Sequence, residues 1–238
     1  MKKAAIWLVL AAASVAVMLL ISWKTGIHWF VPVSILFMIG FHELGHLWMA
    51  KYLGYKTGGF YFIPGLGGMA LIKEMPRFHW HSFLVWYAGP FIGLIETAVL
   101  IAVNHFWIQS PEVWFAAILW AVINLFNMLP ALPLDGGMIA WSMFSSNKSS
   151  YLHHFWYYAF TAASLVFILL TMGMLWAVII GFFGYMQRSY LIRSAEDENG
   201  FIPMTARNFF SALFLYFCLF GGLIYLTYQS ILSFSQSI

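Results

Sequence analysis

Apolar residues along the chain fall into six long runs that are separated by shorter, more polar segments. Most of these runs have the roughly 20 residues that a helix needs to cross a hydrocarbon core of ~30 Å. We therefore expect an all-α polytopic membrane protein with about six transmembrane helices. The runs are Ala4–Trp23, Trp29–Ala50, Phe83–Val103, Val113–Leu132, Phe155–Met186 and Phe209–Tyr228.

The fifth run is longer than one ordinary span. Its 32 residues carry no charge, and as a single helix they would extend about 48 Å at ~1.5 Å per residue. Three arrangements fit this length: one long tilted span, a helix kinked near Gly173, or two short passes. The pattern leaves all three open.

The segment from Thr57 to Glu74 departs from the helical pattern. It mixes glycine and proline with large apolar residues, which is typical of a β-hairpin or a re-entrant strand. A free strand edge at Gly67 and Gly68 would hold an unwound peptide in an extended form, since strand addition is a common mode of peptide binding. A plain interfacial loop fits the same residues equally well.

Composition supports a membrane location and excludes several functions. The 238 residues are 63% hydrophobic and 8% charged, whereas a soluble domain carries roughly 25% charged residues. The 11 Lys and Arg residues are scattered in short segments between the apolar runs, which argues against a nucleic-acid partner. The single cysteine, Cys218, allows neither an intrachain disulfide nor a multi-thiolate metal site. A bound metal would therefore need mainly nitrogen and oxygen ligands.

The positive charges predict the orientation of the chain. With six spans, more of them fall on the side of the amino terminus than on the opposite side, and positive loops face the cytoplasm. We therefore expect both termini to be cytoplasmic. The loop from Gln187 to Asn208 is the exception, because its three arginines lie on the opposite side unless the fifth run crosses twice. The amino-terminal side collects Lys2, Lys3, Lys51, Lys56, Lys73, Arg77 and Lys148.

The second run carries three titratable residues close together, although a charged side chain at the centre of a bilayer costs about 2.5 to 3.5 kcal/mol. They form the sequence His42-Glu43-Leu44-Gly45-His46. On a helix, positions i and i+4 share a face, so both imidazoles can converge on one cation with Glu43 beside them. This arrangement suits a catalytic zinc ion. A polar cluster that only cross-links helices is the alternative.

A carboxylate near the end of another run would supply a third ligand, and Asp135 is the candidate. Before it, Pro130 and Pro133 deny the helix its regular hydrogen bonds, and after it Gly136 and Gly137 free the backbone. Broken backbone at membrane depth is tolerated only where protein or a watery cavity covers it. A buried hydrolytic site needs such a place.

At these residues the chain resembles the site-2 protease family of intramembrane zinc metalloproteases. The family has H-E-x-x-H followed later by N-x-x-P-x-P-x-x-D-G, and here the second motif is approximate, with the spacing N-x-x-P-x-x-P-x-D-G from Asn127 to Gly136. Ala88-Gly89-Pro90 also looks like the family, but Gly93 stands where its usual asparagine is expected. The resemblance covers about residues 41–137.

The resemblance implies one zinc ion per chain, held by His42, His46 and Asp135, with Glu43 as the catalytic base. It favours Asn127 for stabilising the oxyanion, although Asn124 lies on the same helix face, and either amide could instead cross-link helices. Segments similar to Thr57–Glu74 lie beside the active site in the family.

The implied function is zinc-dependent hydrolysis of a peptide bond in or near the transmembrane segment of a membrane-protein substrate, in the cell membrane of a bacterium or an archaeon. We expect residues 1–238 to form a single intramembrane metalloprotease domain, without a PDZ or a nucleotide-sensing CBS domain. The alternative is a metal-ion transporter that uses the same His and Asp cluster. A catalytically silent scaffold is a further alternative. The natural substrate and the oligomeric state are open.

Overall fold

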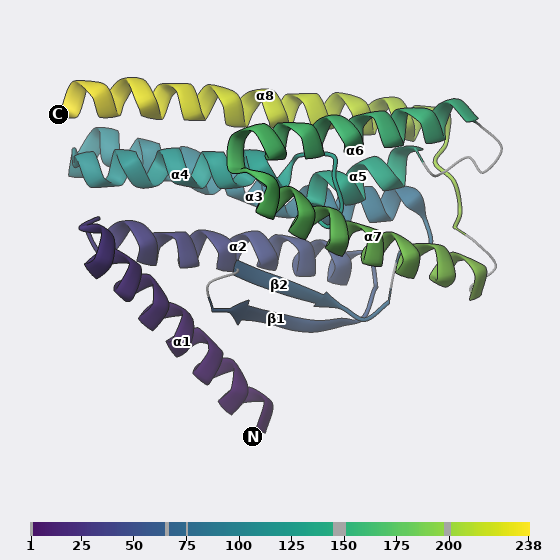
Figure 1. Cartoon of the computed structure of the whole chain (residues 1–238), viewed down its shortest axis with the longest axis horizontal. Coiled ribbons are helices and arrows are strands. Elements are labelled where there is room, and N and C mark those ends of the chain that lie inside the picture. The colour runs from purple at the N-terminus through teal and green to yellow at the C-terminus, as the bar shows by residue number, and fades with distance from the viewer. Residues whose placement is uncertain (1, 65–66, 75, 145–150, 198–200) are drawn as a thin grey trace. The chain divides into compact units, whose positions relative to one another are not determined.

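The computed structural model describes residues 2–64, 67–74, 76–144, 151–197 and 201–238. Helices dominate it, accompanied by a two-stranded sheet (Figure 1). The expected helical fold with a short hairpin after the second apolar run is confirmed. The elements are α1 (Lys2–Thr25), α2 (Phe30–Tyr52), β1 (Thr57–Ile63), β2 (Gly67–Ile72), α3 (His79–Val103) with a π-helical turn (Asn104–Ile108), α4 (Pro111–Asn127), α5 (Asp135–Phe144), α6 (Tyr151–Met172), α7 (Met174–Asp197) and α8 (Ala206–Ser237).

Four helices within the described residues are long and apolar enough to cross a membrane, which corrects the expected count of six. The fourth apolar run is shorter as a helix because α4 ends at Asn127, ahead of Pro130. The other two expected spans lie in α1, where the described apolar stretch is Val9–Thr25, and in α4, Pro111–Asn127. The four candidate spans are Phe30–Tyr52, His79–Ile108, His154–Met172 and Ala206–Ser237.

The fifth apolar run folds as two helices, α6 and α7, which pack against each other. They are joined at Gly173, whose φ is +90°. Its N–H donates to the carbonyl of Leu169 over 3.1 Å and thereby completes the last turn of α6. Glycine adopts a positive φ readily because it has no Cβ. This break excludes the single long tilted helix among the three expected arrangements.

The chain forms two compact units, and the first comprises residues 1–74, 88–125 and 219–238. In this unit α2 packs against α1 and against both strands of the hairpin (Figure 1). The most apolar window of α2 is 56% buried, whereas the corresponding windows of the other three candidate spans are each 17% buried. Since α2 is the most shielded span, polar side chains on it can be kept away from lipid.

The hairpin pairs β1 and β2 in antiparallel fashion, with Phe62 opposite Gly68 and Ile63 opposite Gly67. An ion pair of 2.7 Å between Nζ of Lys56 and Oε1 of Glu74 closes its open end. The hydrogen bond and the negative charge of Glu74 raise the pKa of Lys56. The glycine-rich segment is therefore a defined hairpin rather than a plain loop.

The second unit comprises residues 75–87 and 126–218 and contains the non-helical loop before Asp135. Side-chain hydroxyls satisfy carbonyls that the broken helix leaves open. The hydroxyl of Tyr216 donates to the carbonyl of Met128 over 2.6 Å, and that of Thr161 donates to the carbonyl of Pro130 over 3.2 Å. This pairing lets irregular backbone lie inside an apolar protein.

Gly136 and Gly137 lie inside α5, not in a flexible segment after the carboxylate as the sequence suggests. A Cβ atom added at Gly136 would lie 2.1 Å from the carbonyl oxygen of Met128, and one at Gly137 would lie 2.3 Å from the carbonyl carbon of Ala131. The two glycines therefore allow the loop to pack closely on the start of α5.

Candidate metal centre

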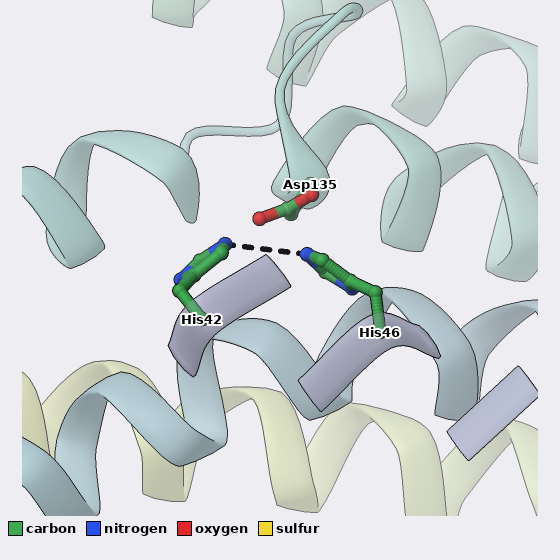
Figure 2. A group of neighbouring side chains, drawn as sticks. All are labelled: His42, His46 and Asp135. Atoms are coloured by element: carbon green, nitrogen blue, oxygen red, sulfur yellow. Dashed lines mark hydrogen bonds between the residues drawn. The ribbon is translucent and has the colours of Figure 1, made fainter. Parts of the chain in front are cut away.

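His42 and His46 lie on one buried face of α2. Their exposed fractions are 3% and 1%, and their Nε2 atoms are 3.2 Å apart. The two rings meet edge to face, with centroids 4.9 Å apart (Figure 2). The four-residue spacing produces this pairing, because side chains at i and i+4 project from the same side of a helix. The structure therefore brings the two predicted imidazoles together.

Asp135 is the first residue of α5 and is 9% exposed. One possible ligand atom from each of His42, His46 and Asp135 lies within 4.8 Å of the others (Figure 2). A carboxylate at this position also interacts favourably with the positive end of the helix dipole. The structure thus gathers the three predicted ligands in one group.

The donor set and its spacing fit a zinc ion. Zinc binds histidine nitrogens at about 2.0–2.1 Å, so two nitrogens at tetrahedral positions are about 3.3 Å apart. The Nε2 atoms of His42 and His46 are separated by 3.2 Å, close to this value. Two imidazoles and one carboxylate would fill three of four positions, as in hydrolytic zinc sites that keep one position open.

Asn124 on α4 contacts His42 on α2, a link that the sequence left open. Nδ1 of His42 donates to Oδ1 of Asn124 over 2.9 Å. The amide nitrogen of Asn124 donates to the carbonyl of Trp120 over 2.9 Å and lies 3.5 Å from Sδ of Met38. Of the two roles considered for this amide, the structure shows the helix cross-link.

Asn127 is the last residue of α4 and is half-buried. Its role at the oxyanion stays a prediction, as do the ligand roles of the two histidines and Asp135. The signal in the sequence that singles out Asn124 is its place inside an apolar run. That signal does not say which neighbouring helix the amide faces.

Two glycines of α3 leave room for the side chains of the centre. A Cβ atom added at Gly89 would lie 2.2 Å from Nε2 of His46, and one at Gly93 would lie 2.0 Å from Oδ1 of Asn124. Any larger residue at these positions would displace the imidazole or the amide. Gly89 of the Ala-Gly-Pro element and Gly93, which stands where the family's usual asparagine is expected, thus both border the centre.

Glu43 is half-buried and lies against the hairpin. A Cβ atom added at Gly68 would lie 2.8 Å from Cγ of Glu43 and 2.6 Å from Cγ2 of Ile39. Gly67 opens β2 opposite Ile63 with a φ of +124°. The structure therefore places β2 directly beside the expected catalytic base, while substrate binding at Gly67 and Gly68 stays a prediction.

Comparison with known proteins points to zinc metalloproteases. No family model matches the chain. The zinc metalloprotease MJ0392 of Methanocaldococcus jannaschii is 29% identical over 194 residues, which cover 78% of this chain and 56% of that protein. The protein sll0528 of Synechocystis, whose name also describes a zinc metalloprotease, is 29% identical over 183 residues, covering 70% of this chain and 48% of that protein. The chain spans about half the length of these relatives.

A solved structure shares the fold. The site-2 protease from Methanocaldococcus jannaschii aligns with a TM-score of 0.52 and 27% sequence identity, over 72% of this chain and 84% of that chain. Sequence similarity and fold similarity thus agree with each other and with the motifs. The resemblance to the site-2 protease family that the sequence motifs indicate is thereby confirmed.

Proposed function

We propose that the chain is a zinc-dependent protease that hydrolyses a peptide bond in or near the transmembrane segment of a membrane protein. The observation that carries the proposal is the pair of buried Nε2 atoms, 3.2 Å apart, on a helix apolar enough to cross a membrane. The names of the relatives and the fold of the solved site-2 protease support the same chemistry.

In this proposal His42, His46 and Asp135 hold one zinc ion per chain. The bound zinc would polarise the scissile carbonyl and make water acidic enough to act as a nucleophile near neutral pH. Shielding by α2 and its neighbours keeps the ligands away from lipid. The protein thereby allows hydrolysis in surroundings where water and charge are both unfavourable.

Glu43 is the general base. Its carboxylate takes a proton from the attacking water and later delivers it to the leaving amine. The amide of Asn127 donates a hydrogen bond to the oxygen that becomes negatively charged in the transition state. Glu43 lies between His42 and His46 in the sequence, and Asn127 precedes Asp135 in the second motif.

The hairpin holds the substrate beside the base. In the part of the chain that the structure describes, the sheet has two strands, so β2 pairs with β1 along one edge and can accept a peptide along the other. Gly68 brings β2 against Glu43. In an intact substrate helix, the carbonyl of the scissile bond is hydrogen-bonded within the helix and shielded. The substrate must therefore unwind locally, and helix-breaking residues near the cut should favour cleavage.

The test is metal dependence of cleavage. Purified protein in lipid vesicles is incubated with a membrane-protein substrate, after removal of metal and after addition of zinc. We expect about one zinc per chain, loss of cleavage on chelation and recovery with zinc. The Asp135→Asn variant should bind zinc more weakly, because an amide oxygen is a poorer ligand than a carboxylate. Cleavage by the metal-free protein would contradict the proposal.

A further inference from the structure

We infer that Asn124 is a positioning residue that fixes the tautomer and the ring orientation of His42, so that Nε2 of His42 is held as a metal-binding nitrogen. The inference rests on the proposed zinc site, because the state of Nε2 matters for a metal that binds there. The hydrogen bonds from which it is argued are those of the protein alone. Asn124 is 0% exposed and His42 is 3% exposed. Their contact is therefore screened from solvent.

The orientation of the Asn124 amide follows from its other neighbours. The carbonyl of Trp120 only accepts hydrogen bonds, so the amide group 2.9 Å from it must be the NH₂ of Asn124. Oδ1 then faces Nδ1 of His42 at 2.9 Å. This oxygen also only accepts, so Nδ1 must carry a proton. A neutral imidazole has one donor and one acceptor, which leaves the lone pair on Nε2.

That lone pair points toward the other imidazole. Nε2 of His42 lies 3.2 Å from Nε2 of His46, where the two rings would share a cation (Figure 2). A ring free to change tautomer would spend part of its time with a proton on this nitrogen, and that proton would have to leave before a metal could bind. Asn124 removes this competition at His42.

The amide is itself held by contacts between α2 and α4. The indole N–H of Trp120 donates to the hydroxyl of Ser34 over 3.2 Å, and that hydroxyl donates to the carbonyl of Val31 over 2.7 Å. Together with the bonds of Asn124, these contacts join the two helices one turn apart along α4. Oδ1 of Asn124, the acceptor for His42, is therefore held in place by these contacts.

Gly93 on α3 makes the arrangement possible. A Cβ atom there would lie 2.0 Å from Oδ1 and 2.4 Å from Cγ of Asn124. In this chain the amide group comes from α4 and occupies the space that a side chain at position 93 would fill. Glycine at position 93 and asparagine at position 124 therefore depend on each other.

The first test measures zinc affinity by competition with a chelator. In Asn124→Leu, which keeps the volume but removes the acceptor, we expect zinc affinity to fall by about 10- to 100-fold. In Asn124→Asp, which keeps an acceptor oxygen, we expect a smaller loss than in Asn124→Leu, because carboxylates are common partners of metal-binding histidines. Asn104→Leu is the matched control, because Asn104 is also 0% exposed but bonds Ser110. Equal affinity in Asn124→Leu and the original protein would overturn the inference.

The second test does not depend on zinc. Ring ¹⁵N chemical shifts of metal-free, histidine-labelled protein, assigned with a His42→Gln variant, report the tautomer of His42. We expect the Nδ1–H form in the original protein and in Asn124→Asp, and loss of this preference in Asn124→Leu. An Nε2–H form in the original protein would overturn the inference. If the original protein shows the Nδ1–H form but binds no zinc, the proposed function fails while the contact between Asn124 and His42 stands.

Discussion

The imidazole of His46 lies against backbone at Gly89, and the amide of Asn124 lies against backbone at Gly93. Residue size therefore shapes this centre as much as residue chemistry does. The two glycines are four residues apart on α3, so they face the same side of the helix. Together they form a surface against which two polar side chains are held in fixed orientations.

Gly89→Ala tests this surface. The added methyl group would lie 2.2 Å from Nε2 of His46, so the ring must turn away from its partner. We expect zinc affinity to fall by at least about tenfold, as for other changes that misplace a ligand, while the helical circular-dichroism signal persists. Gly221→Ala on α8 is the control, because a Cβ there meets nothing within 4 Å. Unchanged zinc affinity in Gly89→Ala would show that this contact does not position His46.

The histidine pair could be predicted from sequence because both residues lie on one helix, whose geometry is fixed by 3.6 residues per turn. Asp135 could be selected because Pro130 and Pro133 mark a break in the apolar pattern. The partner of Asn124 could not be predicted in this way. Its contact with His42 joins two residues that are 82 positions apart in the sequence, and the periodicity of one helix does not specify which neighbour it faces.

Two elements, the hairpin and the break between α6 and α7, depend on glycine for different reasons. In the hairpin, Gly68 permits close approach of β2 to α2. At the end of α6, Gly173 has a φ of +90°, which reverses the chain. Sequence indicated both places through glycine content, but it did not show that one glycine serves packing and the other serves backbone conformation.

Gly68→Ala should separate hydrolysis from metal binding. The added methyl group would lie 2.8 Å from Cγ of Glu43 and 2.6 Å from Cγ2 of Ile39, so β2 must move away from α2. We expect slower cleavage with zinc content unchanged, because the atoms nearest to this Cβ belong to Ile39 and Glu43 rather than to the predicted ligands. Met69→Ala, at an exposed neighbour on the same strand, should cleave at close to the original rate. Equal rates for both variants would argue against a role for β2 beside the base.

Gly173→Ala should destabilise the joint between α6 and α7. An alanine in the left-handed region costs roughly 1–2 kcal/mol, so we expect a lower thermal midpoint in detergent. Gly181→Ala within α7 is the control: a Cβ there meets nothing within 4 Å, and alanine in a helix interior is favoured over glycine by about 0.5–1 kcal/mol. A midpoint for Gly173→Ala at or above that of Gly181→Ala would contradict this account of the break.

For the molecule as a whole, hydropathy predicted the membrane class correctly but overestimated the number of spans. The first and fourth expected spans are not among the four candidates: the described apolar stretch of α1 is Val9–Thr25, and α4 stops at Asn127. The end of α4 leads into the irregular loop before Asp135. The predicted orientation, with cytoplasmic termini, depends on such counts and needs a direct measurement.

Cysteine labelling tests the orientation across α2. In a Cys218→Ser background, which removes the single cysteine, Lys24→Cys places an exposed thiol in the last turn of α1, before α2, and Lys51→Cys places one in the last turn of α2. An impermeant maleimide added to intact cells should label position 24, and it should label position 51 only after permeabilisation, because positive loops remain in the cytoplasm. External labelling at position 51 would reverse the predicted topology.

The measurement that tests the central proposal most directly is cleavage and zinc content in the same sample of Glu43→Gln. Glutamine keeps the size of the side chain but cannot take the proton from water. We expect zinc to stay bound at the original stoichiometry while cleavage of a membrane-protein substrate falls by about 10² to 10⁴, as is typical when a general base is lost. Cleavage by Glu43→Gln at the original rate would contradict the proposed mechanism.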